Sequence, residues 1–178
     1  MMIKIIFLLI AYVAFTNEVA VTRTNDMIWV HIKTSRDFRG VSVKQTSNGY
    51  EIEWLEDFDN STNPLIGYFN YIFEESGHRQ IINIDNLCGT YGRDSIEHAV
   101  QQYILLRFAN TSQCPIKKGT KVIYKLPETF SWQTENRECG LVDGGLYVKK
   151  KKSRRSGHTP FLLRVFLSGN VTGPECAN

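Results

Sequence analysis

Beyond residue 16 the sequence has no apolar run that approaches the roughly 20 residues needed to span a bilayer as a helix. Its longest apolar run, IIFLLIAYVAF at residues 5–15, has eleven residues and follows a short basic start containing Lys4. This order is typical of a secretory signal peptide. We expect residues 1–16 to be cleaved after Thr16, leaving about 162 of the 178 residues as a single domain at 17–178 that is secreted to the extracellular space.

Cysteine is missing from the first half of the chain, and the C-x-x-C spacing of metal and redox sites is missing throughout. The cysteines are Cys88, Cys114, Cys139 and Cys176. In an oxidising compartment an even number predicts two disulfides, and three pairings are open at this point. Secretion also gives meaning to three N-x-S/T glycosylation sequons, at Asn60, Asn110 and Asn170.

Known catalytic motifs are absent as well. There is no G-x-S-x-G elbow, H-E-x-x-H pair, P-loop or dinucleotide-binding glycine pattern. The histidines are scattered. His98 and Glu97 are adjacent on an expected helix, so their side chains point to different sides and cannot form a catalytic pair. The carboxylates Glu56, Asp57 and Asp59 are explained by a solvated acidic turn, since glycosidase chemistry needs a spatial separation that sequence does not show. We expect no enzyme, no cofactor and no metal site.

Alternating apolar and polar residues dominate what is present. Within residues 25–50, Ile28, Val30 and Ile32 alternate as in a half-buried strand, and Asn48-Gly49 predicts a hairpin between VSVKQTS and YEIEWLE. Further strands are expected at residues 65–73, 79–84, 121–126, 146–151 and 161–167. Residues 94–108 have helical spacing, with Asp94 or Ser95 as cap. The sequence predicts a mainly β sandwich or barrel of about seven strands with one helical insertion.

Positive charge is concentrated in one stretch, KKKKSRR. Its basic residues are Lys149, Lys150, Lys151, Lys152, Arg154 and Arg155. Without these six and Lys4, 14 of the 21 basic residues remain against 18 acidic ones, so the rest of the mature chain carries about −4. The stretch is interpreted as a solvated hairpin tip that opposes edge-to-edge association. The alternatives are a site for anionic lipid headgroups or sulfated glycans, and a processing site after Arg155. Secretion disfavours nucleic acid as a partner.

From Cys114 onward the chain carries, in order, CPIKKG, LPETFSW, GGLYV and FLLRVFLSGNV. This order resembles the second half of the ML lipid-recognition superfamily, which includes the ganglioside activator, and is most similar to the insect chemosensory B-type proteins. The similarity covers residues 87–171. It implies an immunoglobulin-like β-cup around an apolar cavity and a Cys88–Cys114 disulfide, which leaves Cys139 and Cys176 to each other. The N-terminal cysteine of the ganglioside activator has no counterpart here.

A lipid-holding cup needs inward apolar surface and an apolar rim. Trp54 and one face of residues 65–73 are candidate lining residues, although ordinary core packing is the simpler role for each. Alternation turns inward either Tyr68, Asn70 and Ile72 or Phe69, Tyr71 and Phe73, and we favour the second set. Phe130 and Trp132 are expected on an exposed loop after Pro127, where they would contact a ligand, membrane or partner.

These observations predict a monomeric, non-enzymatic carrier or sensor of a hydrophobic ligand, such as a fatty acid, a glycolipid or a cuticular hydrocarbon pheromone, that acts in chemosensory perception. The basic tip would select headgroups or touch a membrane surface or receptor. The alternative is an extracellular protein-binding module with a filled core, an accessory to a receptor or channel.

Overall fold

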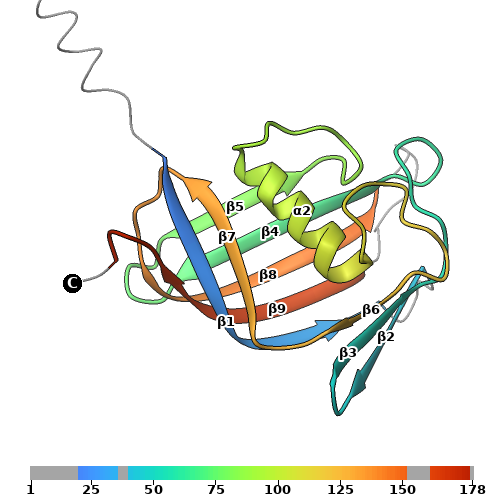
Figure 1. The fold of residues 1–178 in the computed structure, drawn as a ribbon, viewed down its shortest axis with the longest axis horizontal. Helices are drawn as coiled ribbons and strands as arrows, with labels where there is room; N and C mark the ends of the chain where they lie inside the picture. The colour runs from blue at the N-terminus through green and yellow to red at the C-terminus, as the bar shows by residue number, and fades with distance from the viewer. Residues whose placement is uncertain (1–19, 36–39, 152–160, 177–178) are drawn as a thin grey trace, which may run out of the picture.

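The computed structural model describes residues 20–35, 40–151 and 161–176, and in these residues it is mainly β (Figure 1). A six-stranded antiparallel sheet has the order β5 (Arg79–Ile84), β4 (Leu65–Phe73), β8 (Gly140–Lys150), β9 (Phe161–Thr172), β1 (Val21–Lys33) and β7 (Glu128–Thr134). A three-stranded sheet has the order β2 (Val41–Thr46), β3 (Gly49–Trp54) and β6 (Lys121–Tyr124). The predicted mainly β, sandwich-like fold is confirmed, with nine strands described rather than about seven.

The helix α2 (Ile96–Ala109) closes the curled large sheet. Both edge strands of that sheet, β5 and β7, pack against α2, and so do β3 and β6 of the small sheet. Figure 1 shows α2 lying across one face of the large sheet. The Ser95 hydroxyl caps the helix by accepting from the His98 backbone N–H at 3.1 Å, and Asn110 ends it in the left-handed conformation. The predicted helix is confirmed, with Ser95 as its cap.

Strand β4 alternates as the sequence predicts. Phe69, Tyr71 and Phe73 are buried between the sheet and α2, while Tyr68, Asn70 and Ile72 face outward and are half-buried. The predicted hairpin is also present, because β2 and β3 pair around a turn in which Gly49 has a φ of +121°. A side chain at Gly49 would meet the Tyr124 carbonyl oxygen of β6, so this turn also fixes where β6 lies.

The expectation of an exposed loop at Phe130 and Trp132 is wrong. Both lie in β7, where they pair with Asn25 and Arg23 of β1, and their exposed fractions are 8% and 5%. The polar residues of ETFSWQT, which resemble loop composition, alternate with these two rings and form the solvent-facing side of an edge strand.

The expected face of Ile28, Val30 and Ile32 is also only partly correct. The pairing of β1 with β9 shifts register between Met27 and Trp29, as in a β-bulge. Ile28 is therefore 62% exposed, and Met27 takes its place on the inner face with Val30 and Ile32. Strands β8 and β9 are longer than expected, and β6 is shorter.

Two disulfides link Cys88 to Cys114 and Cys139 to Cys176. They agree with an oxidising, extracellular-type environment. In the part of the chain that the structure describes, no helix is long and apolar enough to cross a membrane. The expected signal peptide and its cleavage site, together with Lys152, Arg154 and Arg155, lie outside the described residues.

Candidate functional site

A groove of about 370 Å³ runs between α2 and β7. Its apolar lining comes from Ala99, Tyr103 and Leu106 of α2 and from Phe130 and Trp132 of β7. Its polar lining includes Arg93, His98, Arg107 and Gln133. A second hollow of about 460 Å³ shares Asp94 and Gln133 with this groove, so the two hollows adjoin near the N-terminal end of α2.

The β7 wall is built by strand alternation. Phe130 and Trp132 are two residues apart and therefore project to the same side, where their rings stack with centroids 5.3 Å apart. Tyr103 of α2 completes this wall with its ring 4.8 Å from that of Phe130. Trp132 also meets Tyr71 of β4 at 6.0 Å, edge to face, so the groove wall continues into the core.

One polar atom in this wall lacks a partner. The Trp132 Nε1–H is buried and makes no hydrogen bond of normal geometry with the described residues. The neighbouring Tyr71 hydroxyl donates to the Gln80 side-chain oxygen instead. Burial raises the pKa of Tyr71 well above its usual value, the Glu138 charge adds to this, and a weak, poorly aligned hydrogen bond from the Trp132 indole opposes it. A buried indole N–H without a well-placed acceptor costs free energy of folding.

Deeper in, Tyr103 holds a hydroxyl cluster. Its hydroxyl lies 3.0 Å from that of Tyr124, and both lie 3.1 Å from the Met27 sulfur. Burial raises the pKa of both phenols, that of Tyr124 to about 12. On the surface, Arg107 of α2 pairs with Glu128 of β7 at 2.8 Å and joins the two walls. These contacts hold α2 at a defined distance from β7.

The six predicted ligand residues separate into two groups. Phe130 and Trp132 line the groove, but as buried wall residues rather than an exposed rim. Trp54, Phe69, Tyr71 and Phe73 are buried in the core and line neither the groove nor the adjoining hollow. Trp54 also donates its Nε1–H to the Phe108 carbonyl at 2.7 Å, which fixes β3 to the end of α2.

Sequence reasoning missed the α2 wall of the groove. Tyr103 was assigned only to a helical repeat, and Leu106, which is 48% exposed, and Arg107 were not singled out. The sequence signal for this wall of the groove is weak. It is an exposed leucine near a tyrosine on the same helix, and the opposite wall, β7, begins 20 or more residues later in the chain.

The predicted basic cluster is divided by strand alternation. Lys150 turns toward Glu56, with its Nζ 2.7 Å from the carboxylate, and lies over the Phe58 ring. Lys149 turns to the other side and lies 5.3 Å from the centre of the Phe161 ring. Lys151 is exposed. The hydrogen bond from Lys150 lowers the pKa of Glu56, with burial opposing it. Lys149 and Lys150 therefore do not form one patch.

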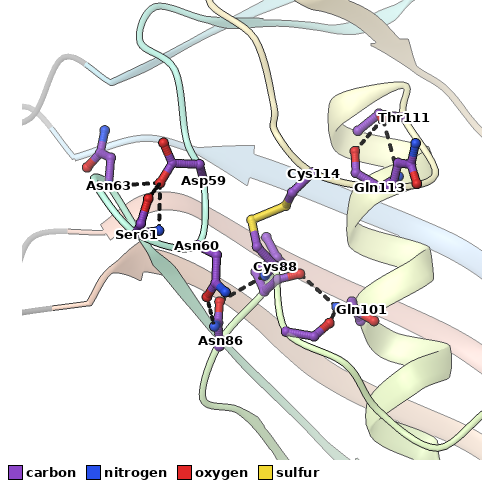
Figure 2. Close-up of a disulfide and its surroundings, with 12 residues drawn as sticks. Asp59, Asn60, Ser61, Asn63, Asn86, Cys88, Gln101, Thr111, Gln113 and Cys114 are labelled. Carbon is purple, nitrogen blue, oxygen red and sulfur yellow. Dashed lines mark hydrogen bonds between the residues drawn. A yellow bond between two sulfur atoms is a disulfide. The ribbon is translucent and has the colours of Figure 1, made fainter.

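The acidic turn is used locally. Asp59 accepts from the backbone N–H groups of Ser61 and Thr62 and from the Thr62 hydroxyl, which lowers the pKa of Asp59 strongly. The next residue, the sequon Asn60, is exposed and accepts from Asn86 beside the Cys88–Cys114 disulfide (Figure 2). Asn110 is exposed at the helix end, and Asn170 is half-buried within β9.

Gln101 fixes the Cys88 segment to α2. It is buried, and its side-chain amide donates to the carbonyl oxygens of Leu87 at 2.8 Å and Gly89 at 2.7 Å (Figure 2). The disulfide thus joins the segment before α2 to the segment after it, and Gln101 fixes the first of these segments to the helix.

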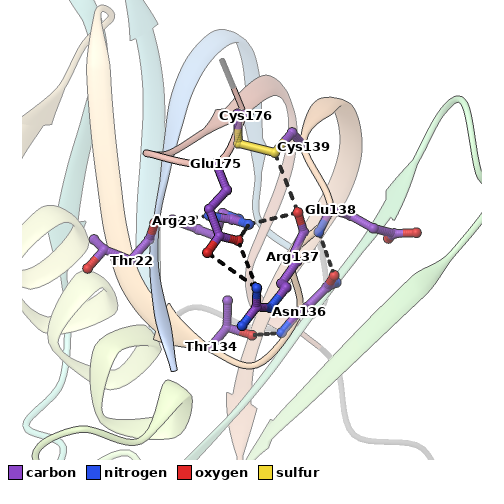
Figure 3. Close-up of polar contacts among 9 residues, drawn as sticks. All are labelled: Thr22, Arg23, Thr134, Asn136, Arg137, Glu138, Cys139, Glu175 and Cys176. Carbon is purple, nitrogen blue, oxygen red and sulfur yellow. Dashed lines mark hydrogen bonds and ion pairs between the residues drawn. A yellow bond between two sulfur atoms is a disulfide. The ribbon is translucent and has the colours of Figure 1, made fainter. Parts of the chain in front are cut away.

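A second polar network lies under the Cys139–Cys176 disulfide (Figure 3). Arg23 is buried in β1, donates to the Arg137 carbonyl at 2.7 Å and lies 3.6 Å from the Glu175 carboxylate. Glu175 also pairs with the Arg137 side chain at 3.3 Å. The network joins the first strand, the segment before β8 and the C-terminal segment.

Within residues 20–35, 40–151 and 161–176, no group of three or more His, Cys, Asp or Glu side chains could hold a metal ion. Comparisons with protein-family models, characterised proteins and solved structures find no match.

Proposed function

We propose that this protein is a secreted, non-enzymatic carrier or sensor of a small hydrophobic ligand, which it holds in the groove between α2 and β7. The observation that carries the proposal is the stacked pair Phe130 and Trp132, which with Tyr103 forms an aromatic wall of the groove. Small-molecule sites combine apolar walls with polar groups that orient the ligand, and the lining of this groove contains both.

The size of the groove bears on the ligand class. Ligand pockets span about 300–1,000 Å³, and 370 Å³ is near the lower end of that range. A single alkyl chain, as in a fatty acid or a cuticular hydrocarbon, suits this volume better than a two-chain glycolipid. Each methylene buried would contribute about 0.8 kcal/mol. Arg93, Asp94 and His98 all line the groove, so its polar groups favour a ligand with a hydrogen-bonding head.

Membership of the ML lipid-recognition superfamily, and a role in chemosensory perception, are part of this proposal. The Cys88–Cys114 disulfide that the resemblance implies is present and brackets α2. Both disulfides suit a secreted protein.

The experiment is lipid extraction from secreted protein, followed by mass spectrometry and titration with a fluorescent fatty acid. Leu106→Gln places an amide in the groove and should weaken probe binding about tenfold or more. Leu141→Gln is the matched control, because Leu141 is 50% exposed against 48% for Leu106 and lines none of the hollows described. No co-purified lipid together with no probe binding would refute the proposal, and so would equal effects of the two variants.

A filled core favours the second candidate, an extracellular protein-binding accessory module. Ring contacts run without a break from Phe73 through Tyr71, Trp132, Phe130 and Tyr103 to Phe108 and Tyr124. This candidate predicts that the groove binds no probe and that Leu106→Gln disturbs association with a receptor or channel instead.

A further inference from the structure

The outer face of the large sheet carries aromatic rings near the point where β8 ends and β9 begins. The rings are those of Tyr68, Tyr147, Phe161 and Phe166, which we call the aromatic face. All four are half-buried, and Tyr147 contacts each of the other three with centroids 5.1–6.4 Å apart. An outward sheet face that meets water usually carries polar residues, so this cluster requires an explanation.

Arg164 lies at the centre of the aromatic face. Its guanidinium carbon is 5.3 Å from the centre of the Tyr147 ring, 5.0 Å from that of Phe161 and 5.3 Å from that of Phe166. Arg164 is exposed, and among the residues that the structure describes it has no carboxylate or carbonyl hydrogen-bond partner. Three rings thus hold a planar cation whose N–H donors face solvent, which is a preorganised site for an oxyanion.

Two further cations flank Arg164. Lys33 of β1 is its register partner on the neighbouring strand, and Lys149 of β8 is the register partner of Phe161. Lys33 is therefore directly beside Arg164, and Lys149 is on the strand at the other side, two residues beyond Tyr147, the β8 register partner of Arg164. On the same face, Asp143 accepts from Ser168, and Asp85 follows the far edge strand β5.

Gly145 allows the Tyr147 ring to lie along the sheet. A Cβ at Gly145 would come within 2.8 Å of the Tyr147 Cε2 and Oη atoms, so the ring covers this glycine instead of standing upright. The result is a cluster of rings close to the sheet, in which the other three rings are inclined by 47–81° to that of Tyr147 and cations lie over them.

We propose that the aromatic face, with Arg164, Lys33 and Lys149, binds a sulfated glycan. Sulfate groups would pair with the guanidinium and the two ammonium groups, and the sugar rings would lie on the aromatic faces. The four rings are half-buried beneath the cations, which favours a polyanionic chain over insertion into a membrane, and the half-exposed Trp29 on the same face of β1 offers a further ring for a sugar. This inference does not rest on the proposed ligand groove.

The test is binding of the full mature chain, with both disulfides formed, to immobilised heparin over a range of salt concentrations. Wild-type protein should bind heparin in a salt-dependent manner and should bind fully desulfated heparin at least tenfold more weakly. Arg164→Gln should weaken heparin binding about tenfold, and Lys149→Gln should weaken it severalfold. Arg164→Lys, which keeps the charge but loses the planar fork, should recover only part of the affinity.

The matched control is Lys44→Gln, which removes one exposed positive charge from the small sheet and should change binding less than twofold. Circular dichroism and thermal melting verify that each variant is folded. If Arg164→Gln does not fold, Lys149→Gln still tests the proposal. Equal losses in Lys149→Gln and Lys44→Gln would overturn the proposal. It would also be overturned by a loss confined to a K152Q/R154Q/R155Q variant, or by binding to phosphatidylglycerol vesicles without binding to heparin.

Discussion

The indole of Trp132 lies nearly parallel to the phenyl ring of Phe130, with 15° between the ring planes, and its Nε1–H makes no hydrogen bond of normal geometry with the described residues. The ring therefore contributes packing, while its one polar atom is poorly compensated.

Substitution of Trp132 separates these two contributions. Trp132→Phe keeps a ring and removes the unpaired donor, so it should lower the free energy of unfolding by less than about 1.5 kcal/mol. Trp132→Ala leaves a cavity and should cost about 3–5 kcal/mol. Urea denaturation measures both. Similar costs for the two variants would mean that the indole N–H has an acceptor in solution.

Arg23 and Arg137 form a second matched pair, since both contact Glu175 but only Arg23 is buried. Arg23→Ala removes buried stem contacts and the donor to the Arg137 carbonyl, so we expect a loss of roughly 2–4 kcal/mol. Arg137→Ala removes an exposed ion pair and should cost under about 1 kcal/mol. Chemical denaturation at low and high salt distinguishes the two, because only the exposed pair should depend on salt. A cost for Arg137→Ala equal to that for Arg23→Ala contradicts this account.

Each disulfide should stabilise the fold by a similar amount. The cysteine pairs are 26 and 37 residues apart in sequence, and loop closure of that size corresponds to about 3–4 kcal/mol in the chain-entropy model. Cys88→Ser with Cys114→Ser, and Cys139→Ser with Cys176→Ser, should each lower the free energy of unfolding accordingly. Measurement is by urea unfolding of the two double variants. A loss below about 1 kcal/mol for either variant would show that its bridge does not restrain the unfolded chain as expected.

The buried phenols predict a decline in stability at alkaline pH. Burial raises the pKa values of Tyr71, Tyr103 and Tyr124 in the folded protein, that of Tyr124 to about 12, whereas an unfolded tyrosine titrates near 10. Above pH 10 the folded state therefore holds more protons than the unfolded state, and the free energy of unfolding falls as pH rises. Ultraviolet titration should show three tyrosines that ionise well above pH 10 unless the protein unfolds first. Tyr124→Phe should reduce this pH dependence, and ionisation of every tyrosine near pH 10 in a still-folded protein would contradict the prediction.

Local signals in the sequence were sufficient for several elements. Asn48-Gly49 predicts the β2–β3 hairpin because the turn needs a positive φ, and Gly49 has one. Ser95 followed by apolar residues at helical spacing predicts α2. The alternation in β4 identifies Phe69, Tyr71 and Phe73 as the inward set, because a strand with one buried face has only two choices.

Other features depended on neighbours that the sequence does not identify. The polar residues of β7 have the composition of a loop; they are Thr129, Ser131 and Gln133. They form a strand because the edge of β1 that does not pair with β9 pairs with β7. The bulge at Met27 and Trp29 exchanges Met27 for Ile28 on the inner face, which alternation alone does not predict.

The amino-acid sequence by itself determined the fold class, the helix and its cap, and the inward face of β4, since each follows from turn chemistry or from the periodicity of adjacent residues. The tertiary structure alone decided that Phe130 and Trp132 form a wall with Tyr103, and that Arg164 lies among three rings on the opposite face of the sheet. Both arrangements join side chains from segments far apart in the chain, and only the curvature of the sheet around α2 and the registers of β1, β8 and β9 bring those segments together.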